Sequence, residues 1–173
     1  MITRLLVMML VMQAIPFTLK AQAVFHDVEA NEALGQVKSI KTSWQGNNNF
    51  ITFSQEGRMS SDELDDADYD ADGYIKTAVL KVGGVTVVQT YEWEHGMIKA
   101  VTSAMPSLGN MTTTTTREYD NRKVVVAEST EASGIVVRME YSGYLFDSRG
   151  NWIRRKVTTN GETFVMTRDI AYY

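Results

Sequence analysis

The acidic stretch at residues 68–75, DYDADGYI, carries the clearest candidate chemistry in the chain. Three Asp residues at alternate positions, with a Gly at the bend, match the first eight positions of a calcium loop, which surrounds the ion with about six to eight oxygens. The twelfth position is Val79 instead of a bidentate Glu, so Asp65 or Asp66 would have to supply further oxygens. The sequence therefore predicts a Ca²⁺ site at Asp68, Asp70 and Asp72, with a plain acidic turn as the alternative.

A second candidate is the carboxylate pair Glu92 and Glu94, two residues apart on a predicted strand and therefore on one face of it. Two carboxylates about 5–9 Å apart carry out glycoside hydrolysis. The alternative is an exposed strand face opposite Tyr91 and Trp93. We favour this alternative and predict no catalytic residue.

The two histidines, His26 and His95, are far apart in the sequence, and the chain has no cysteine. A zinc site is therefore poorly supported, and disulfides and a cysteine nucleophile are excluded. The chain also lacks the G-x-S-x-G turn that presents a serine nucleophile. These residue types predict a protein that is not an enzyme.

Aromatic side chains offer a different chemistry, the stacking of sugar rings. Trp152 alternates with Arg154 and Lys156, while Ile153 and Val157 occupy the other strand face. This places Trp152 on the more polar side. We predict that it is an exposed, ligand-binding aromatic, with a buried core position as the alternative.

The N-terminal residues have the pattern of an export signal. Arg4 precedes an apolar run at 5–17, and Ala21-Gln22-Ala23 forms an A-x-A cleavage site. The run is shorter than the roughly 20 residues that span a bilayer. We predict a cleaved signal peptide at 1–23 and one mature domain at 24–173 without a transmembrane segment. The protein is then exported across the inner membrane to the periplasm, the cell surface or the medium.

The charge of the predicted mature chain limits its partners. Loss of Arg4 and Lys20 leaves 15 basic residues against 21 acidic ones. Nucleic-acid binding requires a basic footprint, which this chain lacks. An envelope protein or a glycan is the expected partner.

Hydrophobic alternation of period two predicts an all-β domain after one short helix at 27–34, for which Asp27 is the expected N-cap. The runs at 46–49 and 60–68 are predicted to be a turn and a solvated acidic loop. Strands are predicted at 36–45, 50–54, 74–82, 85–93, 97–104, 111–119, 124–126, 135–146, 152–158 and 163–173. Gly83-Gly84 and Asn160-Gly161 predict two-residue hairpin turns, and Gly143 predicts a β-bulge.

One type of turn recurs along the chain. An aromatic residue, a polar turn and usually a Gly are repeated, and the aromatic residues Tyr69, Trp93, Tyr119 and Phe146 recur every 24 to 27 positions. Each unit would be one hairpin. A bare meander of hairpins cannot bury both faces, so we predict a strongly twisted, curled sheet or a partly open barrel.

These turns resemble the YD repeats of RHS-type bacterial surface proteins, best at Tyr69-Asp70…Gly73…Ile75 and Phe146-Asp147…Gly150. The ending also resembles that of small secreted YD-like proteins of anaerobic gut bacteria. The resemblance covers about residues 35–173. It implies a hairpin architecture and no particular activity, and the chain has too few units to form the shells of large YD-repeat proteins.

The sequence thus leaves three functions to compare. The first is a non-catalytic binding module of the bacterial envelope. The second is a carrier that holds a small lipid or glycan in a half-barrel cavity. The third is a glycan-acting enzyme that uses Glu92 and Glu94.

Overall fold

The computed structural model describes residues 24–173, so the predicted signal peptide lies outside the described residues. The described chain begins with the helix α1 (Asp27–Ala30) and a single 3₁₀ turn, η1 (Pro106–Leu108), follows β7. The strands are β1 (Val37–Trp44), β2 (Asn47–Phe53), β3 (Met59–Ser60), β4 (Leu64–Tyr69), β5 (Ile75–Val82), β6 (Val85–Glu94), β7 (Met97–Met105), β8 (Met111–Tyr119), β9 (Val125–Ala132), β10 (Ile135–Phe146), β11 (Trp152–Thr159) and β12 (Glu162–Tyr172).

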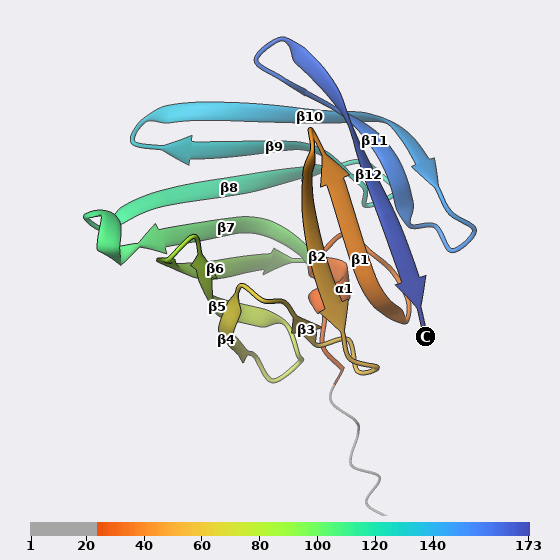
Figure 1. The fold of residues 1–173 in the computed structure, drawn as a ribbon, viewed down its shortest axis with the longest axis horizontal. Helices are drawn as coiled ribbons and strands as arrows, with labels where there is room; N and C mark the ends of the chain where they lie inside the picture. The colour runs from red at the N-terminus through yellow and green to blue at the C-terminus, as the bar shows by residue number, and fades with distance from the viewer. Residues whose placement is uncertain (1–23) are drawn as a thin grey trace, which may run out of the picture.

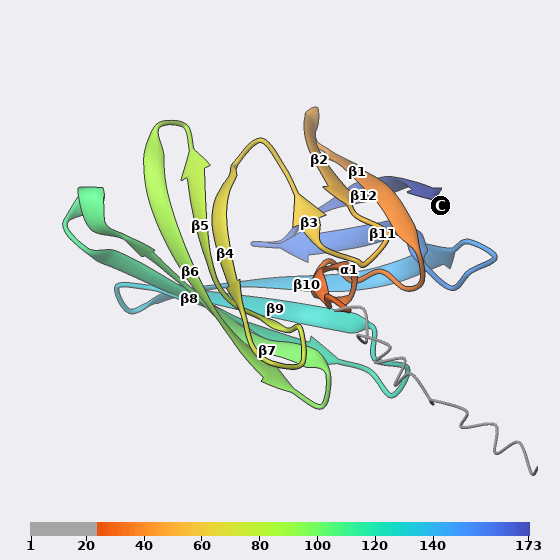
Figure 2. The ribbon, with the colours of Figure 1, turned by 90° about the horizontal axis from the view of Figure 1, so that it is seen from below.

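All strands within residues 24–173 belong to one antiparallel sheet, in the order β3-β2-β1-β12-β11-β10-β9-β8-β7-β6-β5-β4. The sheet curls into a nearly closed barrel (Figures 1 and 2). Its two edges, β3 and β4, are consecutive in the chain, while β1 pairs with β12, the last strand. This confirms the predicted all-β meander and its curled, partly open barrel, and the C-terminal strand is held in the sheet by its pairing.

Side chains alternate between the inside and the outside of this barrel, as the pleat of a strand requires. Many outward positions carry exposed charges, among them Lys41, Lys99, Glu118, Arg138, Glu140, Lys156 and Asp169. Two apolar clusters lie on the inside. One joins α1 to β1 and β2 through Val28, Val37 and Phe53, and the other joins β9, β10 and β11 through Val125, Tyr141 and Val157.

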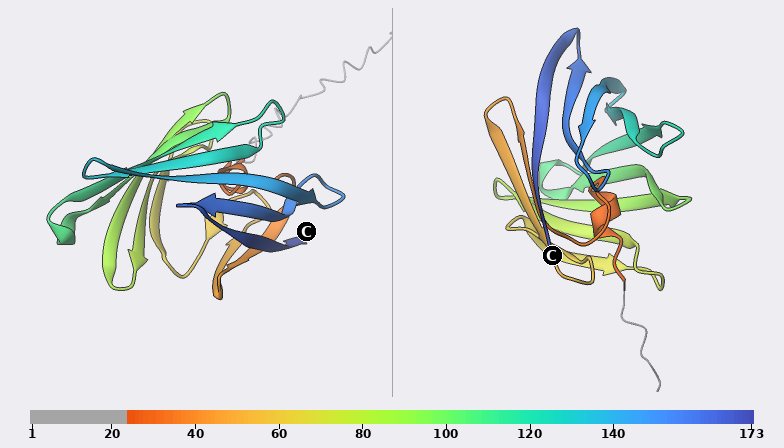
Figure 3. Two further views of the ribbon diagram at one scale, coloured as in Figure 1. Left: turned by 90° about the horizontal axis from the view of Figure 1, so that it is seen from above. Right: turned by 90° about the vertical axis from the view of Figure 1, so that its right-hand side faces the viewer.

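The N-terminal segment enters the barrel at one end (Figure 3). The backbone N–H groups of Phe25 and His26 donate to the carbonyl oxygens of Glu56 and Gly73, at 2.9 and 3.1 Å. The segment around α1 then contacts opposite walls: Met59 of β3 bonds Asp27, and Arg117 of β8 bonds the Ala30 carbonyl. Contacts from both sides place α1 inside the curl of the sheet.

The repeated turn is also a repeated geometry at this end of the barrel. Asp70, Asp120 and Asp147 each accept backbone N–H bonds from the residues two and four positions later, at 2.9–3.0 Å. The fourth turn residue has a positive φ in each case: Gly73 at 90°, Lys123 at 64° and Gly150 at 84°. The Asp therefore holds the five-residue turn closed, which is the physical reason for its recurrence. The turn at His95-Gly96 is a two-residue hairpin instead.

Several local predictions are confirmed. Gly83-Gly84 and Asn160-Gly161 connect paired strands. The strand predicted at 111–119 is β8, and the register of β10 against β11 shifts between Ser142 and Leu145, around Gly143. The β-bulge thus occurs where the apolar phase of the sequence changes.

Other predictions were wrong. The helix is a single turn that ends at Ala30, because Glu32 adopts a φ of 54°, and its N-cap is His26. The acidic segment 64–69 is strand β4 and Asn47–Asn49 belong to β2, because pairing with β5 and β1 outweighs their low strand propensity. Tertiary pairing, which local composition does not reveal, decided these segments.

Candidate functional site

A cavity of about 300 Å³, partly open to solvent, lies between α1 and strands β2, β3 and β5–β8. Its apolar lining comprises Ala30, Ile51, Met59, Ile75, Leu80, Ile98 and Val101. Its uncharged polar lining includes Asn31, Asn49, Gln89, Tyr91, Ser103 and Thr115, and Asp27, Glu63 and Arg117 add charges. The cavity therefore combines a hydrocarbon surface with hydrogen-bonding groups, as small-molecule sites do.

Cross-strand register aligns the polar wall of this cavity. Tyr91 on β6 pairs with Val101 on β7, which pairs with Thr115 on β8, so all three face inward at one level. The Tyr91 hydroxyl donates to Gln89 Oε1 at 2.7 Å, and Gln89 Nε2 donates to Ser103 Oγ at 3.3 Å. Burial raises the pKa of Tyr91 to about 12, so its phenol stays neutral at physiological pH.

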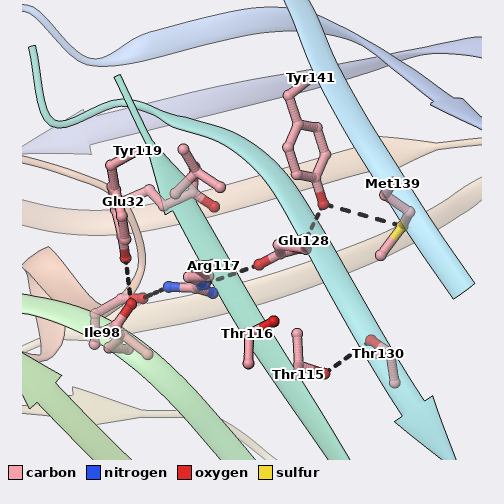
Figure 4. A network of polar contacts seen from close by, with 12 residues as sticks. Glu32, Ile98, Thr115, Thr116, Arg117, Tyr119, Glu128, Thr130, Met139 and Tyr141 are labelled. Atoms are coloured by element: carbon pink, nitrogen blue, oxygen red, sulfur yellow. Dashed lines mark hydrogen bonds and ion pairs between the residues drawn. The ribbon is translucent and has the colours of Figure 1, made fainter. Parts of the chain in front are cut away.

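Arg117 forms the boundary between the cavity and a buried polar network (Figure 4). Its Nε donates to Glu128 Oε1 at 2.8 Å, and its Nη1 donates to the Ala30 carbonyl at 3.2 Å. Tyr141 donates its hydroxyl to the other oxygen of Glu128. The Arg117 charge is therefore balanced by a partner of its own, and Arg117 fixes α1 against β8.

A second buried ion pair anchors the segment after α1. Glu32 Oε2 accepts from Arg155 Nη1 at 2.7 Å and from Trp152 Nε1 at 3.1 Å. Arg168 Nη1 donates to the Glu32 carbonyl oxygen at 3.1 Å. Burial alone would raise the pKa of Glu32, but the charges of Arg155, Arg168 and Arg117 outweigh it and hold the pKa below the ordinary value.

Asp27 is a fully buried carboxylate of the plug, the N-terminal segment at 24–34 that contains α1, with 0% of its surface exposed. Its Oδ2 accepts from the Met59 backbone N–H at 2.7 Å and from the Tyr69 hydroxyl at 2.6 Å. Asp27 thus bridges β3 and β4, the two edges of the sheet. Its Oδ1 is buried and has no hydrogen-bond partner within residues 24–173. Burial raises the pKa of this carboxyl group.

The predicted calcium ligands are not gathered around one point. Asp68 lies on β4 and pairs with Lys76 Nζ at 3.0 Å, while Asp70 Oδ1 is occupied by the amides of its own turn. Asp72 lies within that turn. Within residues 24–173 no group of three or more His, Cys, Asp or Glu side chains is arranged to hold a metal ion. The Ca²⁺ site at Asp68, Asp70 and Asp72 stays a prediction.

The prediction that Trp152 is exposed was wrong. Its side chain is 3% exposed and lies between the guanidinium groups of Arg155 and Arg168, at 4.1 and 3.6 Å from the ring centroid. The inward-facing arginines of β11 and β12 attract the indole ring, because cations favour aromatic faces. Trp152 therefore packs inside the barrel and offers no stacking surface to solvent.

Glu92 and Glu94 are exposed on the face of β6 opposite Tyr91, so they point away from the cavity. His95 is exposed in the β6–β7 turn. His26 stacks on Tyr74, with the ring centroids 4.0 Å apart. None of these side chains lines the barrel cavity.

The residues that do line the cavity were mostly missed by the sequence reading. Gln89 lies between Val87 and Tyr91 on the inward face of β6. A polar residue at a position where the alternation predicts an apolar one could have indicated that this face lines a cavity. Arg117 occupies the same phase on β8 as Thr115 and Tyr119. Asp27 gave no such signal, since its partners come from β3 and β4.

Comparison with known proteins gives one distant structural likeness. No family model and no curated protein matches the chain. A crystal structure of a porin-like protein from Bacteroides vulgatus superposes with a TM-score of 0.47 at 10% identity, over 79% of this chain and 98% of that one. Within residues 24–173, no helix has the length and apolar character needed to cross a membrane.

Proposed function

We propose that the protein is a non-catalytic binding protein of the bacterial envelope that carries a small ligand inside its barrel. The cavity of about 300 Å³, lined by apolar side chains and a hydrogen-bonded polar wall, is the observation that carries this proposal. This volume lies at the low end of ligand pockets. A ligand of one ring or one short chain with polar substituents would fit it best.

The carrier proposal is supported by how the chain is arranged around the cavity. Buried hydrogen bonds join the plug segment around α1 to β3, β8 and β12, so the segment beneath the cavity is tied to three strands. A preformed site loses little conformational entropy when a ligand binds. The candidate catalytic pair Glu92 and Glu94 lies on the outer face, and we therefore propose no enzymatic step.

A second candidate function is docking of another envelope protein, and the outer end of β10 favours it. Ile135 and Val136 are 68% and 62% exposed, and they lie beyond Met139, where pairing with β11 ends. An unpaired apolar strand edge is suited to strand addition by a partner. Val136→Lys should abolish capture of such a partner and leave small-ligand binding unchanged.

The test of the carrier proposal compares two neighbouring positions on β7. Ser103→Phe places a ring inside the cavity, whereas Thr102→Phe places the same ring on the outer face, because adjacent strand residues face opposite ways. A small-fragment library is screened by ligand-observed NMR against the wild type and both variants. Fragments should bind the wild type and Thr102→Phe but not Ser103→Phe. No binding to the wild type, or equal binding to both variants, would refute the carrier proposal.

A further inference from the structure

The unpaired Oδ1 of Asp27 distinguishes this cavity from an inert packing gap. Asp27 lines the cavity, is 0% exposed and uses Oδ2 for both of its side-chain hydrogen bonds. A buried carboxylate oxygen without a donor is costly, and native structures seldom retain one without a role. A donor supplied from outside the chain would satisfy this oxygen, and because Asp27 has no exposed surface, the side chains that cover it must move for that donor to reach it.

The charges that line the cavity indicate what kind of donor fits. Arg117 is balanced by Glu128 at 2.8 Å, which leaves Asp27 and Glu63 as carboxylates without an ion pair in the described chain. Arg58 is near Asp27 but lies over the rings of Phe25 and Tyr69, at 5.5 and 5.4 Å from their centroids. Glu63 is exposed to solvent, so among the described residues that line the cavity Asp27 is the buried carboxylate without an ion pair.

We propose that the cavity binds a small organic amine as its ammonium ion, with one N–H donated to Asp27 Oδ1. This inference rests on the proposed carrier function and names its ligand class. Met59, whose N–H bonds the same carboxylate, lies with Ile51 and Ile75 in the apolar lining that would contact the hydrocarbon part.

An ammonium ion fits better than a neutral alcohol or a metal ion. A hydrogen bond between two charged groups is roughly twice as strong as a neutral one. A calcium ion would need about six to eight oxygens, and Asp27 offers one free oxygen. Burial raises the pKa of Asp27, and a bound cation would lower it again, so amine binding stabilises the ionised carboxylate.

The experiment uses two probes of nearly equal shape, cyclohexylammonium and cyclohexanol, titrated into the full mature chain by calorimetry. The wild type should bind the ammonium at least about tenfold more tightly than the alcohol, as a charged hydrogen bond predicts. Asp27→Asn keeps an acceptor for Met59 and Tyr69 but replaces the free oxygen with an NH₂ donor. It should reduce ammonium affinity at least about tenfold and change alcohol affinity little.

Two further readouts locate the effect. The backbone amide resonance of Met59 should shift on ammonium binding, since its acceptor is the same carboxylate. Glu63→Gln removes the other lining charge and should weaken ammonium binding less than Asp27→Asn does. If Asp27→Asn does not fold, the ratio of the cyclohexylammonium and cyclohexanol affinities of the wild type still tests the amine inference.

The outcomes separate the two proposals. Equal affinity for both probes overturns the amine inference and leaves the carrier function in place. The same holds if other fragments bind the cavity and neither probe does. If no small molecule binds the wild type at all, the carrier function fails and the amine inference fails with it.

Discussion

Replacement of Glu32 by Gln tests whether the buried ion network holds the plug inside the barrel. The substitution keeps the size of the side chain and one acceptor oxygen for Trp152 and Arg155. It removes the negative charge that faces Arg155, Arg168 and Arg117. The guanidinium of Arg155 would then stay desolvated, with a side-chain exposure of 5% and no carboxylate partner.

The size of the effect follows from this burial. Removing one partner of a buried ion pair costs about 3–5 kcal/mol. Because the amide oxygen keeps part of the hydrogen bonding, we expect the lower end, about 3 kcal/mol of unfolding free energy. For a domain of this size each kcal/mol shifts the melting temperature by about 2–4 °C, so the expected decrease is about 6–12 °C.

Calorimetry and urea denaturation of Glu32→Gln measure this decrease. The matched control is Glu118→Gln, which removes the same group from an ion pair with Arg138 on the outer face, where the two side chains are 43% and 58% exposed. Solvent screens such a pair, so the control should melt close to the wild type. If both variants melt within 2 °C of the wild type (about 1 kcal/mol or less), the network does not hold the plug and the reasoning is wrong.

Three further predictions concern the turns, acid stability and calcium. Gly73→Ala should destabilise the fold more than Gly150→Ala. Both positions have a left-handed φ, which costs Ala about 1–2 kcal/mol. A Cβ at Gly73 would also collide with the Val24 carbonyl oxygen, whereas a Cβ at Gly150 would meet open space. Equal melting temperatures of the two variants would contradict the docking of the N-terminal segment against Gly73. Since the pKa of Glu32 lies below its ordinary 4.5, its contribution is complete above pH 4.5 and is lost as the pH falls through the folded-state pKa. A pH series of urea midpoints should therefore fall more steeply in acid for the wild type than for Glu32→Gln, and parallel curves would count against this. A filled Ca²⁺ site at the triple-Asp stretch would raise the melting temperature by several degrees in millimolar Ca²⁺ relative to EDTA, and no shift would remove that prediction.

Local patterns predicted much of the fold because β-strands and tight turns are governed by near neighbours. The alternation of Tyr91 and Trp93 with Glu92 and Glu94 placed two faces of β6 correctly. The Gly at position 143 marked the bulge of β10. The same reasoning failed at Trp152, because a shift in the β10–β11 register between Trp152 and Arg154 breaks the period-two alternation, so Trp152 shares the inner face with Arg155 and Val157 and not with Lys156.

The candidate site was far less predictable, since it depends on contacts between distant segments. From the sequence, Asp27 is a typical helix N-cap residue. Only in the folded chain do Met59 and Tyr69 donate hydrogen bonds to its carboxylate, so that Asp27 bridges the two edges of the sheet. The alternation of the sequence can place Arg117 and Gln89 on the inward face of their strands, but it does not show that this face lines a cavity.

The amino-acid sequence alone determined the elements of this protein: a meander of hairpins joined by a recurring polar turn, and no cysteine chemistry. Only the tertiary structure decided that β1 pairs with β12, that α1 enters the barrel, and that a cavity remains above it. The physical reason is range. Hairpin turns depend on residues within five positions, whereas barrel curvature and a buried carboxylate without a partner depend on every strand that surrounds them.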